Sequence, residues 1–186
     1  MNYKEFHEEY IHNLVGVLDN EEVESQIEKL VRLIVKTHKG GGTVYLFGNG
    51  GHSATATHNS TDLGSLGIKA VSLTANTSEL TRIANDFGYE YVFQKQLENC
   101  LEEMDLVIGI SASGNSQNVI EALKYANQQR ATSVAMVGFQ EGGLAKKIAK
   151  HYIHIKTEDG AYGLAEDAHM TICHLVVFYL KGHGGF

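Results

Sequence analysis

The strongest candidate for ligand chemistry is the serine loop Ser111-Ala112-Ser113-Gly114-Asn115-Ser116, which follows the apolar run DLVIGI at 105–110 and precedes a helical pattern. Small residues let backbone N–H groups approach an anion, serine hydroxyls add donors, and a helix N-terminus carries about half a positive charge. The loop therefore predicts a phosphate-binding site. The alternative is a simple helix cap made by Ser113 or Asn115.

A second loop, Gly48-Asn49-Gly50-Gly51-His52-Ser53, follows the β-rich run TVYLF at 43–47 and also opens a helical pattern. It lacks both the GxGxxG order of a dinucleotide site and the lysine of a Walker loop, which argues against NAD and ATP. Asn49 could bind a sugar hydroxyl. The alternative is a tight turn that needs glycine torsions.

His58 and Asp62 lie four residues apart in the helical pattern after this second loop. That spacing places both side chains on one face of a helix. A histidine and a carboxylate so placed can share a metal ion or act as an acid/base pair. The alternative is an ordinary surface pair.

The last helical pattern carries Glu166, His169 and His174. Glu166 and His174 are slightly over two turns apart and can share a face, whereas His169 is offset from both. The residues after His174 are strongly apolar, and a glutamate and a histidine on such a helix cost free energy unless they have partners. The alternative is a core histidine whose ring nitrogens are hydrogen-bonded, together with a carboxylate that interacts favourably with the helix dipole.

The periodicity of apolar residues predicts the elements that must position these side chains. Two amphipathic helices come first, and either cover an edge of the sheet or pack on a partner subunit. Five strands then alternate with helices, which predicts an α/β three-layer sandwich with a five-stranded parallel sheet in one domain, residues 1–186, divided into a helical pair (1–39) and a β/α core (40–186). The expected helices are 3–18, 21–38, a stretch ending near 63, 77–84, 90–102, 117–128, 143–150 and 164–180, and the expected strands are 43–47, 69–73, 105–110, 133–139 and 152–156.

Composition excludes several classes of protein. The formal net charge of −7 argues against general nucleic-acid binding. Cys100 and Cys173 are far apart in apolar stretches, so we expect no disulfide framework and a reducing compartment. The N-terminus has no signal-peptide core, and no apolar run approaches the roughly 20 residues that span a bilayer. We therefore expect a cytoplasmic protein without nucleic-acid or membrane partners.

Taken together, these motifs resemble the sugar isomerase (SIS) domain, and more narrowly the phosphoheptose isomerase family. The matching segments, which occur in the family's order, are GNGG at 48–51, His58 with Asp62, NDFG at 85–88, SASGNS at 111–116 and EDAHMTICH at 166–174. The resemblance implies a flavodoxin-like fold and a homotetramer with active sites at subunit interfaces. It also implies conversion of sedoheptulose 7-phosphate to a heptose 7-phosphate, as in heptose biosynthesis.

The resemblance further implies roles for individual residues. It implies a divalent metal, usually zinc, on His58, Asp62, Glu166 and His174, although manganese or iron would also suit such ligands. Substrate binding is expected at Asn49, Gly50, Gly51, His52, Ser53, Asp86, Ser111, Ser113, Asn115 and Ser116. For the isomerisation, Asp62 or Glu166 would be the base and His174 its acid partner; if Asp62 ligates the metal, Glu166 is the better base.

This chain departs from the family pattern at several positions. Asp62 replaces the usual glutamate, Glu166 a glutamine, His52 a serine and Ala112 a threonine, and an expected arginine is missing from Gly64-Ser65-Leu66-Gly67. Three alternatives stay open. The first is an isomerase for another sugar phosphate, and the second is a non-catalytic SIS-domain sensor of phosphosugars. The third is a structural or assembly subunit whose histidines all lie in the core.

Overall fold

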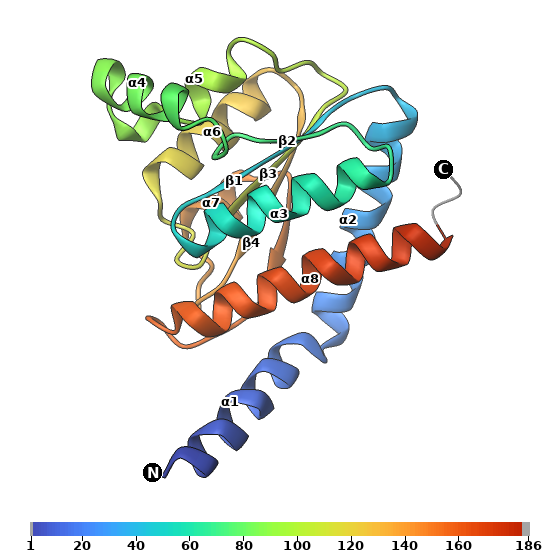
Figure 1. Ribbon diagram of the computed structural model, residues 1–186, viewed down its shortest axis with the longest axis vertical. Helices are drawn as coiled ribbons and strands as arrows, with labels where there is room; N and C mark the ends of the chain where they lie inside the picture. The colour runs from blue at the N-terminus through green and yellow to red at the C-terminus, as the bar shows by residue number, and fades with distance from the viewer. Residues whose placement is uncertain (1, 184–186) are drawn as a thin grey trace.

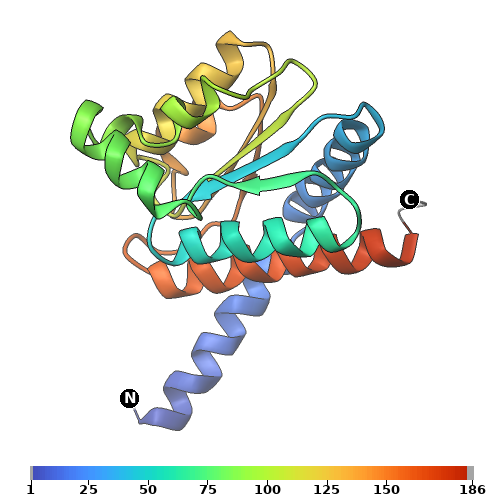
Figure 2. The same cartoon turned by 45° about the horizontal axis from the view of Figure 1, so that its top comes forward.

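The computed structural model describes residues 2–183, which form a five-stranded sheet with helices on both faces (Figures 1 and 2). All strands are parallel, in the order β2-β1-β3-β4-β5. The predicted α/β class and five-stranded parallel sheet are confirmed. The elements are α1 (Tyr3–Leu18), α2 (Glu21–Lys39), β1 (Val44–Gly48), α3 (Gly51–Ser65), β2 (Ala70–Ser72), α4 (Thr77–Phe87), the 3₁₀ turn η1 (Tyr89–Tyr91), α5 (Gln94–Leu97), β3 (Leu106–Ser111), α6 (Gln117–Gln128), β4 (Thr132–Val137), α7 (Gly143–Ile148), β5 (His151–His154) and α8 (Tyr162–His183).

Alternation along the buried strands separates two hydrophobic layers. In β1, Val44 and Leu46 point into a core shared with α2, α3 and α8, whereas Tyr45 and Phe47 point into a second core shared with α4 to α7. This period of two follows from the pleat of a strand. Both faces of the sheet are therefore covered, as a parallel sheet requires.

The two N-terminal helices behave differently. The side chain of Asn20 caps α2. Within this helix, Leu30 and Ile34 are buried in the core that α2 shares with α8. In contrast, α1 buries no residue and projects away from the body (Figure 1). The last turns of α1 pack Leu14, Val17 and Leu18 against the core, and farther out the Tyr10 hydroxyl donates to Asp167 at 2.6 Å. This bond to a carboxylate raises the pKa of Tyr10 to about 12.

One expected helix is wrong in its length. Instead of a helix over 90–102, the chain forms only η1 and the one-turn helix α5. Before β3, the Asp105 carboxylate accepts the backbone N–H of Glu102 at 2.7 Å and that of Thr43 at 2.7 Å. Such side-chain bonds compete with helix hydrogen bonds, and here they keep residues 102–105 out of a helix ahead of β3.

Two expectations from composition can be compared with the structure. Cys100 and Cys173 are both free thiols. This agrees with the expectation that the chain has no disulfide framework. Within residues 2–183, no helix combines the length and apolarity needed to cross a bilayer.

The topology creates one crevice at the carboxyl ends of the central strands. From β1 the chain crosses one face of the sheet through α3, and from β3 it crosses the other face through α6. In sheets of order 2-1-3-4-5, ligands bind where these crossovers diverge. Gly48 at the end of β1 keeps the strand ends close, because a Cβ there would overlap His52 and the Ile110 carbonyl.

Candidate functional site

A cavity of about 230 Å³ lies at this divergence point, between the ends of β1 and β3 and the start of α8. Its lining residues are Asn49, Gly50, His52, Ser111, Ala112, Ser113, Ser116, Tyr162 and Glu166. The two loops identified from the sequence, about 60 residues apart in the chain, therefore meet around one small cavity. Six of the ten expected substrate residues line it; the roles of all ten stay predictions.

The serine loop presents donors toward this cavity. The hydroxyls of Ser111 and Ser116 lie 3.2 Å apart, and the backbone N–H of Gly114 donates to the Ser111 hydroxyl. Ser116 is the N-cap of α6 and makes no side-chain capping bond. The alternative that Ser113 or Asn115 caps α6 is not what the structure shows, since Ser113 accepts from Asn115 and Asn115 accepts from Leu144.

A second glycine turn holds the serine loop in shape. The Gly114 carbonyl accepts the N–H of Ala145, and the Asn115 side chain accepts that of Leu144. Gly114 has φ of +64° and Gly143 φ of +61°, and a Cβ on either would overlap the backbone of the opposite turn. Glycine is therefore required at both positions, because it alone tolerates this conformation and this approach.

The other four expected substrate residues do not line the cavity. Gly51 lies beside it, and a Cβ there would overlap the Glu166 carboxylate, which rests against the N-terminus of α3 where the helix dipole favours negative charge. Ser53 contributes its carbonyl to Thr74, and Asn115 serves the glycine turn. Asp86 is exposed on α4, 3.7 Å from Arg82.

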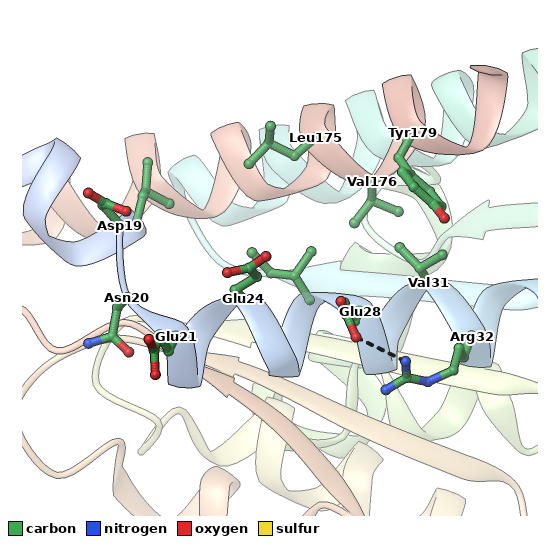
Figure 3. A pocket seen from close by; sticks show the side chains of 12 residues that line it. Asp19, Asn20, Glu21, Glu24, Glu28, Val31, Arg32, Leu175, Val176 and Tyr179 are labelled. Atoms are coloured by element: carbon green, nitrogen blue, oxygen red, sulfur yellow. Dashed lines mark hydrogen bonds and ion pairs between the residues drawn. The ribbon is translucent and has the colours of Figure 1, made fainter. Parts of the chain in front are cut away.

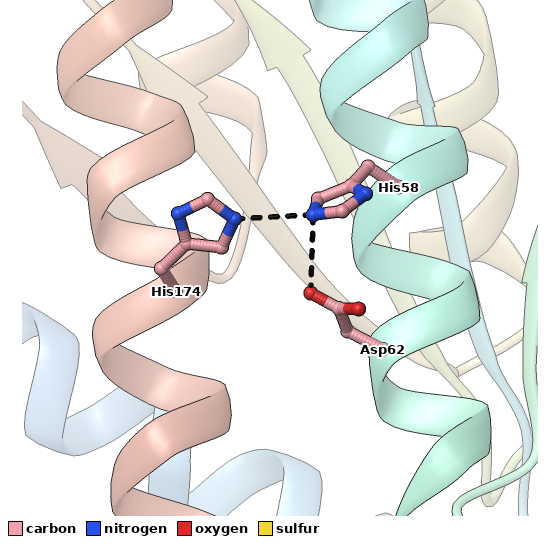
Figure 4. Close-up of side chains that lie close together, drawn as sticks. All are labelled: His58, Asp62 and His174. Atoms are coloured by element: carbon pink, nitrogen blue, oxygen red, sulfur yellow. Dashed lines mark hydrogen bonds and ion pairs between the residues drawn. The ribbon is translucent and has the colours of Figure 1, made fainter.

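His58, Asp62 and His174 come together on the outer side of α3 and α8 (Figure 4). The Nε2 atoms of His58 and His174 lie 3.1 Å apart, and Asp62 Oδ2 lies 3.3 Å from His58 Nε2. One donor atom from each residue falls within 4.8 Å of the others. Two imidazoles and a carboxylate at such separations suit a divalent metal such as zinc with an open coordination position.

Glu166, the fourth expected ligand, is not part of this cluster. It is eight residues before His174 on α8, a rise of about 12 Å along the helix. Glu166 instead lines the cavity beside the serine loop. A single copy of this chain therefore separates the expected phosphate site and Glu166 from the triad of His58, Asp62 and His174.

A buried histidine pair lies between these two regions. His52 Nε2 and His169 Nδ1 are 3.0 Å apart, and the two residues are 4% and 0% exposed. One ring must donate and the other accept, so both can be neutral. Burial lowers the pKa of His52 to about 4 and that of His169 to about 3. His169 is therefore a core histidine whose Nδ1 pairs with His52, whereas its buried Nε2 has no hydrogen-bond partner among the described residues.

This pair predicts loss of stability in mild acid. Unfolded histidines take up protons below about pH 6.5, whereas the buried pair resists protonation until about pH 4. The stabilisation is therefore complete above pH 6.5 and declines as the pH falls toward 4. We expect His52→Asn to reduce the slope of unfolding free energy against pH by about 1 kcal/mol per unit in this window.

Urea unfolding of the parent and the variant at half-unit steps of pH measures this slope. At pH 8 the two slopes should coincide, which is the internal control. Equal slopes between pH 6.5 and 4.5 would show that His52 titrates alike in the folded and unfolded chains.

Three residues near the cavity carried no signal recognised in the sequence. Tyr162 forms part of the cavity wall, and its ring meets that of Phe139 edge to face. Tyr89 and Asn118 both hydrogen-bond to Asn49. Asn118 could have been noticed, because it is an amide among apolar residues immediately after the serine loop.

Known proteins share both the sequence and this architecture. Residues 9–138 match the sequence profile of the SIS domain. A probable phosphoheptose isomerase from Thermoplasma volcanium is 37% identical over 158 residues, which cover 82% of this chain and 79% of the relative. A phosphoheptose isomerase from Akkermansia muciniphila is 34% identical over 179 residues, covering 90% and 93%. This chain belongs to the phosphoheptose isomerase family.

A solved member of the phosphoheptose isomerase family has the same fold throughout. The structure of the phosphoheptose isomerase GmhA from Neisseria gonorrhoeae superposes with a TM-score of 0.88 at 26% identity, covering 97% of this chain and 100% of that one. The family expected from the motifs is thereby confirmed. Because coverage is nearly complete on both sides, the N-terminal helices are part of the phosphoheptose isomerase architecture and not an addition to it.

Proposed function

We propose that this chain is a phosphoheptose isomerase that interconverts sedoheptulose 7-phosphate and a heptose 7-phosphate through an enediol. The observation that carries the proposal is the meeting of the serine loop, Asn49 and Glu166 around one cavity at the divergence of β1 and β3, in a chain of this family. The volume of this cavity, about 230 Å³, suits a small ligand and not a dinucleotide.

The serine loop would hold the phosphate. The N-cap residue of α6, Ser116, makes no side-chain capping bond, and Ser111, Ser113 and Ser116 all line the cavity. No lysine or arginine is among the residues that line it, so hydroxyls, backbone N–H groups and the helix dipole would supply the attraction. Anchoring the phosphate fixes the sugar for the reaction at its other end.

A divalent metal, most simply zinc, would be held by the triad of His58, Asp62 and His174, with Glu166 as the fourth ligand. When bound there, it would supply Lewis-acid polarisation of the sugar carbonyl. Because Glu166 lies about 12 Å along α8 from His174, the four ligands can meet only if Glu166 comes from a second copy.

Sites shared between copies of a homotetramer would satisfy this requirement. The triad is open on its outer side, where the His58 side chain is 51% exposed. Beyond the triad, α8 exposes the large apolar side chains of Leu175, Phe178 and Tyr179. Between α2 and α8 there is a groove of about 660 Å³ with Leu175, Val176 and Val31 on its apolar walls (Figure 3). Exposed apolar surface of this kind is typical of a protein–protein interface.

Isomerisation requires one base and one acid. From the ketose, the base removes a proton from C1, the C2 carbonyl oxygen gains a proton, and the enediol is then protonated at C2 as the C1 hydroxyl loses its proton. A carboxylate that ligates a metal through both oxygens is a poor base, but Asp62 would keep one oxygen free if it ligated through the other. We favour Asp62 as the base on that condition, because the usual family residue at the position of Glu166 is a glutamine, which cannot accept a proton. His174, which lies beside His58, would donate to oxygen through the ring nitrogen that does not bind the metal.

The base can be identified by two conservative variants. Asp62→Asn should lower kcat by about 10²-fold or more, the contribution of a positioned base. Glu166→Gln should keep turnover within about tenfold of the parent. The reverse result, with Glu166→Gln inactive and Asp62→Asn active, would transfer proton abstraction to Glu166.

Elemental analysis of gently purified protein, with turnover of sedoheptulose 7-phosphate before and after chelation, tests the whole proposal. Near-stoichiometric metal and chelator-sensitive turnover are expected. Metal without turnover would point to another sugar phosphate. Neither metal nor turnover, even after zinc is restored, would favour a phosphosugar sensor.

A further inference from the structure

Asn118 is a buried amide on the second residue of α6, immediately beyond the serine loop, and is 3% exposed. Its side chain forms a reciprocal amide pair with that of Asn49, which lines the substrate cavity. Asn118 Nδ2 donates to Asn49 Oδ1 at 2.9 Å, and Asn49 Nδ2 donates to Asn118 Oδ1 at 2.9 Å. Asn118 has no role in the chemistry proposed above, and Asn49 has only the sugar contact expected from the sequence.

The backbone determines which way this pair is oriented. The N–H of Val119 donates to Asn118 Oδ1 at 3.0 Å. A backbone N–H can only donate, so the atom that it meets must be the amide oxygen. This fixes the orientation of the Asn118 amide, and the reciprocal bonds then fix the amide of Asn49 in turn.

A third contact completes the environment of Asn49. The Tyr89 hydroxyl donates to Asn49 Oδ1 at 2.9 Å. That oxygen therefore accepts from both Tyr89 and Asn118, which uses both of its lone pairs. The amide nitrogen, in contrast, donates one hydrogen to Asn118 and keeps a second one. Asn49 is thus left with an N–H, and no oxygen, to offer to a ligand.

We infer that Asn118 is a positioning residue for the proposed isomerase, which holds Asn49 so that it acts only as a hydrogen-bond donor toward the sugar phosphate. The N–H of Asn49 would recognise an acceptor oxygen on the ligand, which can belong to a carbonyl, a hydroxyl or the phosphate. The inference rests on the proposed function for its substrate, but not for its geometry. It explains why a polar amide occupies an otherwise apolar position of α6.

Asn118→Asp is the most direct perturbation, because it keeps the shape and replaces the donating NH2 with an oxygen. An aspartate oxygen would face Asn49 Oδ1 in either orientation of the Asn49 amide, so the reciprocal pair should separate and no longer hold the Asn49 N–H toward the ligand. We expect KM for sedoheptulose 7-phosphate to rise roughly tenfold to hundredfold, the effect of losing one oriented hydrogen bond. The change in kcat should be smaller than the change in KM.

A double-mutant cycle separates positioning from a general loss of stability. With Asn49→Ala already present, Asn118→Ala should cause no further loss of kcat/KM, since it acts only through Asn49. Asn127→Ala is the matched control. Asn127 lies near the C-terminal end of the same helix, and its side chain donates to the Ile148 carbonyl at 2.8 Å. It should lower the Tm and leave KM unchanged. Multiplicative losses in the Asn49/Asn118 cycle would overturn the inference.

A measurement without substrate keeps this test independent of the proposed function. The side-chain amide resonances of Asn49, assigned by their disappearance in Asn49→Ala, should shift in Asn118→Ala and not in Asn127→Ala. Unchanged resonances in Asn118→Ala would overturn the positioning role whatever the substrate is. If the resonances shift but the parent protein does not turn over sedoheptulose 7-phosphate, the proposed function fails and the positioning of Asn49 stands.

Discussion

His174→Ala is expected to lower kcat/KM for sedoheptulose 7-phosphate by about 10²- to 10⁴-fold, the range for loss of a positioned acid–base group. The imidazole Nε2 lies 3.1 Å from that of His58 and belongs to the only cluster of metal-binding geometry among the described residues. Its removal takes away both a proton donor and one of the predicted metal ligands. The side chain is only partly buried, so the Tm should change little.

The matched control for this variant is His183→Ala. His183 is also a histidine of α8, but it is exposed at the C-terminal end of the helix, where within residues 2–183 it contacts the carbonyl and the ring of Tyr179. Metal content should fall in His174→Ala and stay unchanged in His183→Ala. Near-normal turnover in His174→Ala would remove this residue from the catalytic site and leave the triad as a surface cluster.

Gly114→Ala is expected to destabilise the protein by about 3 kcal/mol or more. The φ of +64° is unfavourable for any residue with a Cβ by about 1–2 kcal/mol, and the added methyl group would also overlap the Gly142 carbonyl. The serine loop and the glycine turn would have to separate. A loss of this size lowers the Tm of a chain of this length by roughly 6–12 °C.

The effect should extend to ligand binding, because the same loop presents the expected phosphate donors. Thermal unfolding and calorimetric titration with sedoheptulose 7-phosphate measure the two effects separately. Gly64→Ala is the control: Gly64 is an exposed glycine of α3 with open space around it, so alanine should be neutral or stabilise by up to about 1 kcal/mol. A Gly114→Ala protein with parent Tm and affinity would show that the two turns can move apart freely.

Local patterns predicted most of the fold. Apolar residues with a period of two, or of three to four, are visible within a few turns of chain, and they located all five strands and most helices. The order of the loops relative to the strands also placed the serine loop and Asn49 at one edge of the sheet. The prediction of a helix over 90–102 was wrong, because the spacing of apolar residues carries no information about the bonds of Asp105 to Glu102 and Thr43.

The sequence by itself determined the fold class, the family and the residue types available for chemistry, because these depend on composition, short-range periodicity and motif order. Only the tertiary structure decided which side chains meet. The packing of α3 beside α8 brings His58 to His174 and His52 to His169 across more than 110 residues. The same packing leaves Glu166 at the cavity and away from the triad. Such pairings arise from the register of two packed helices, and no local pattern in either helix specifies that register.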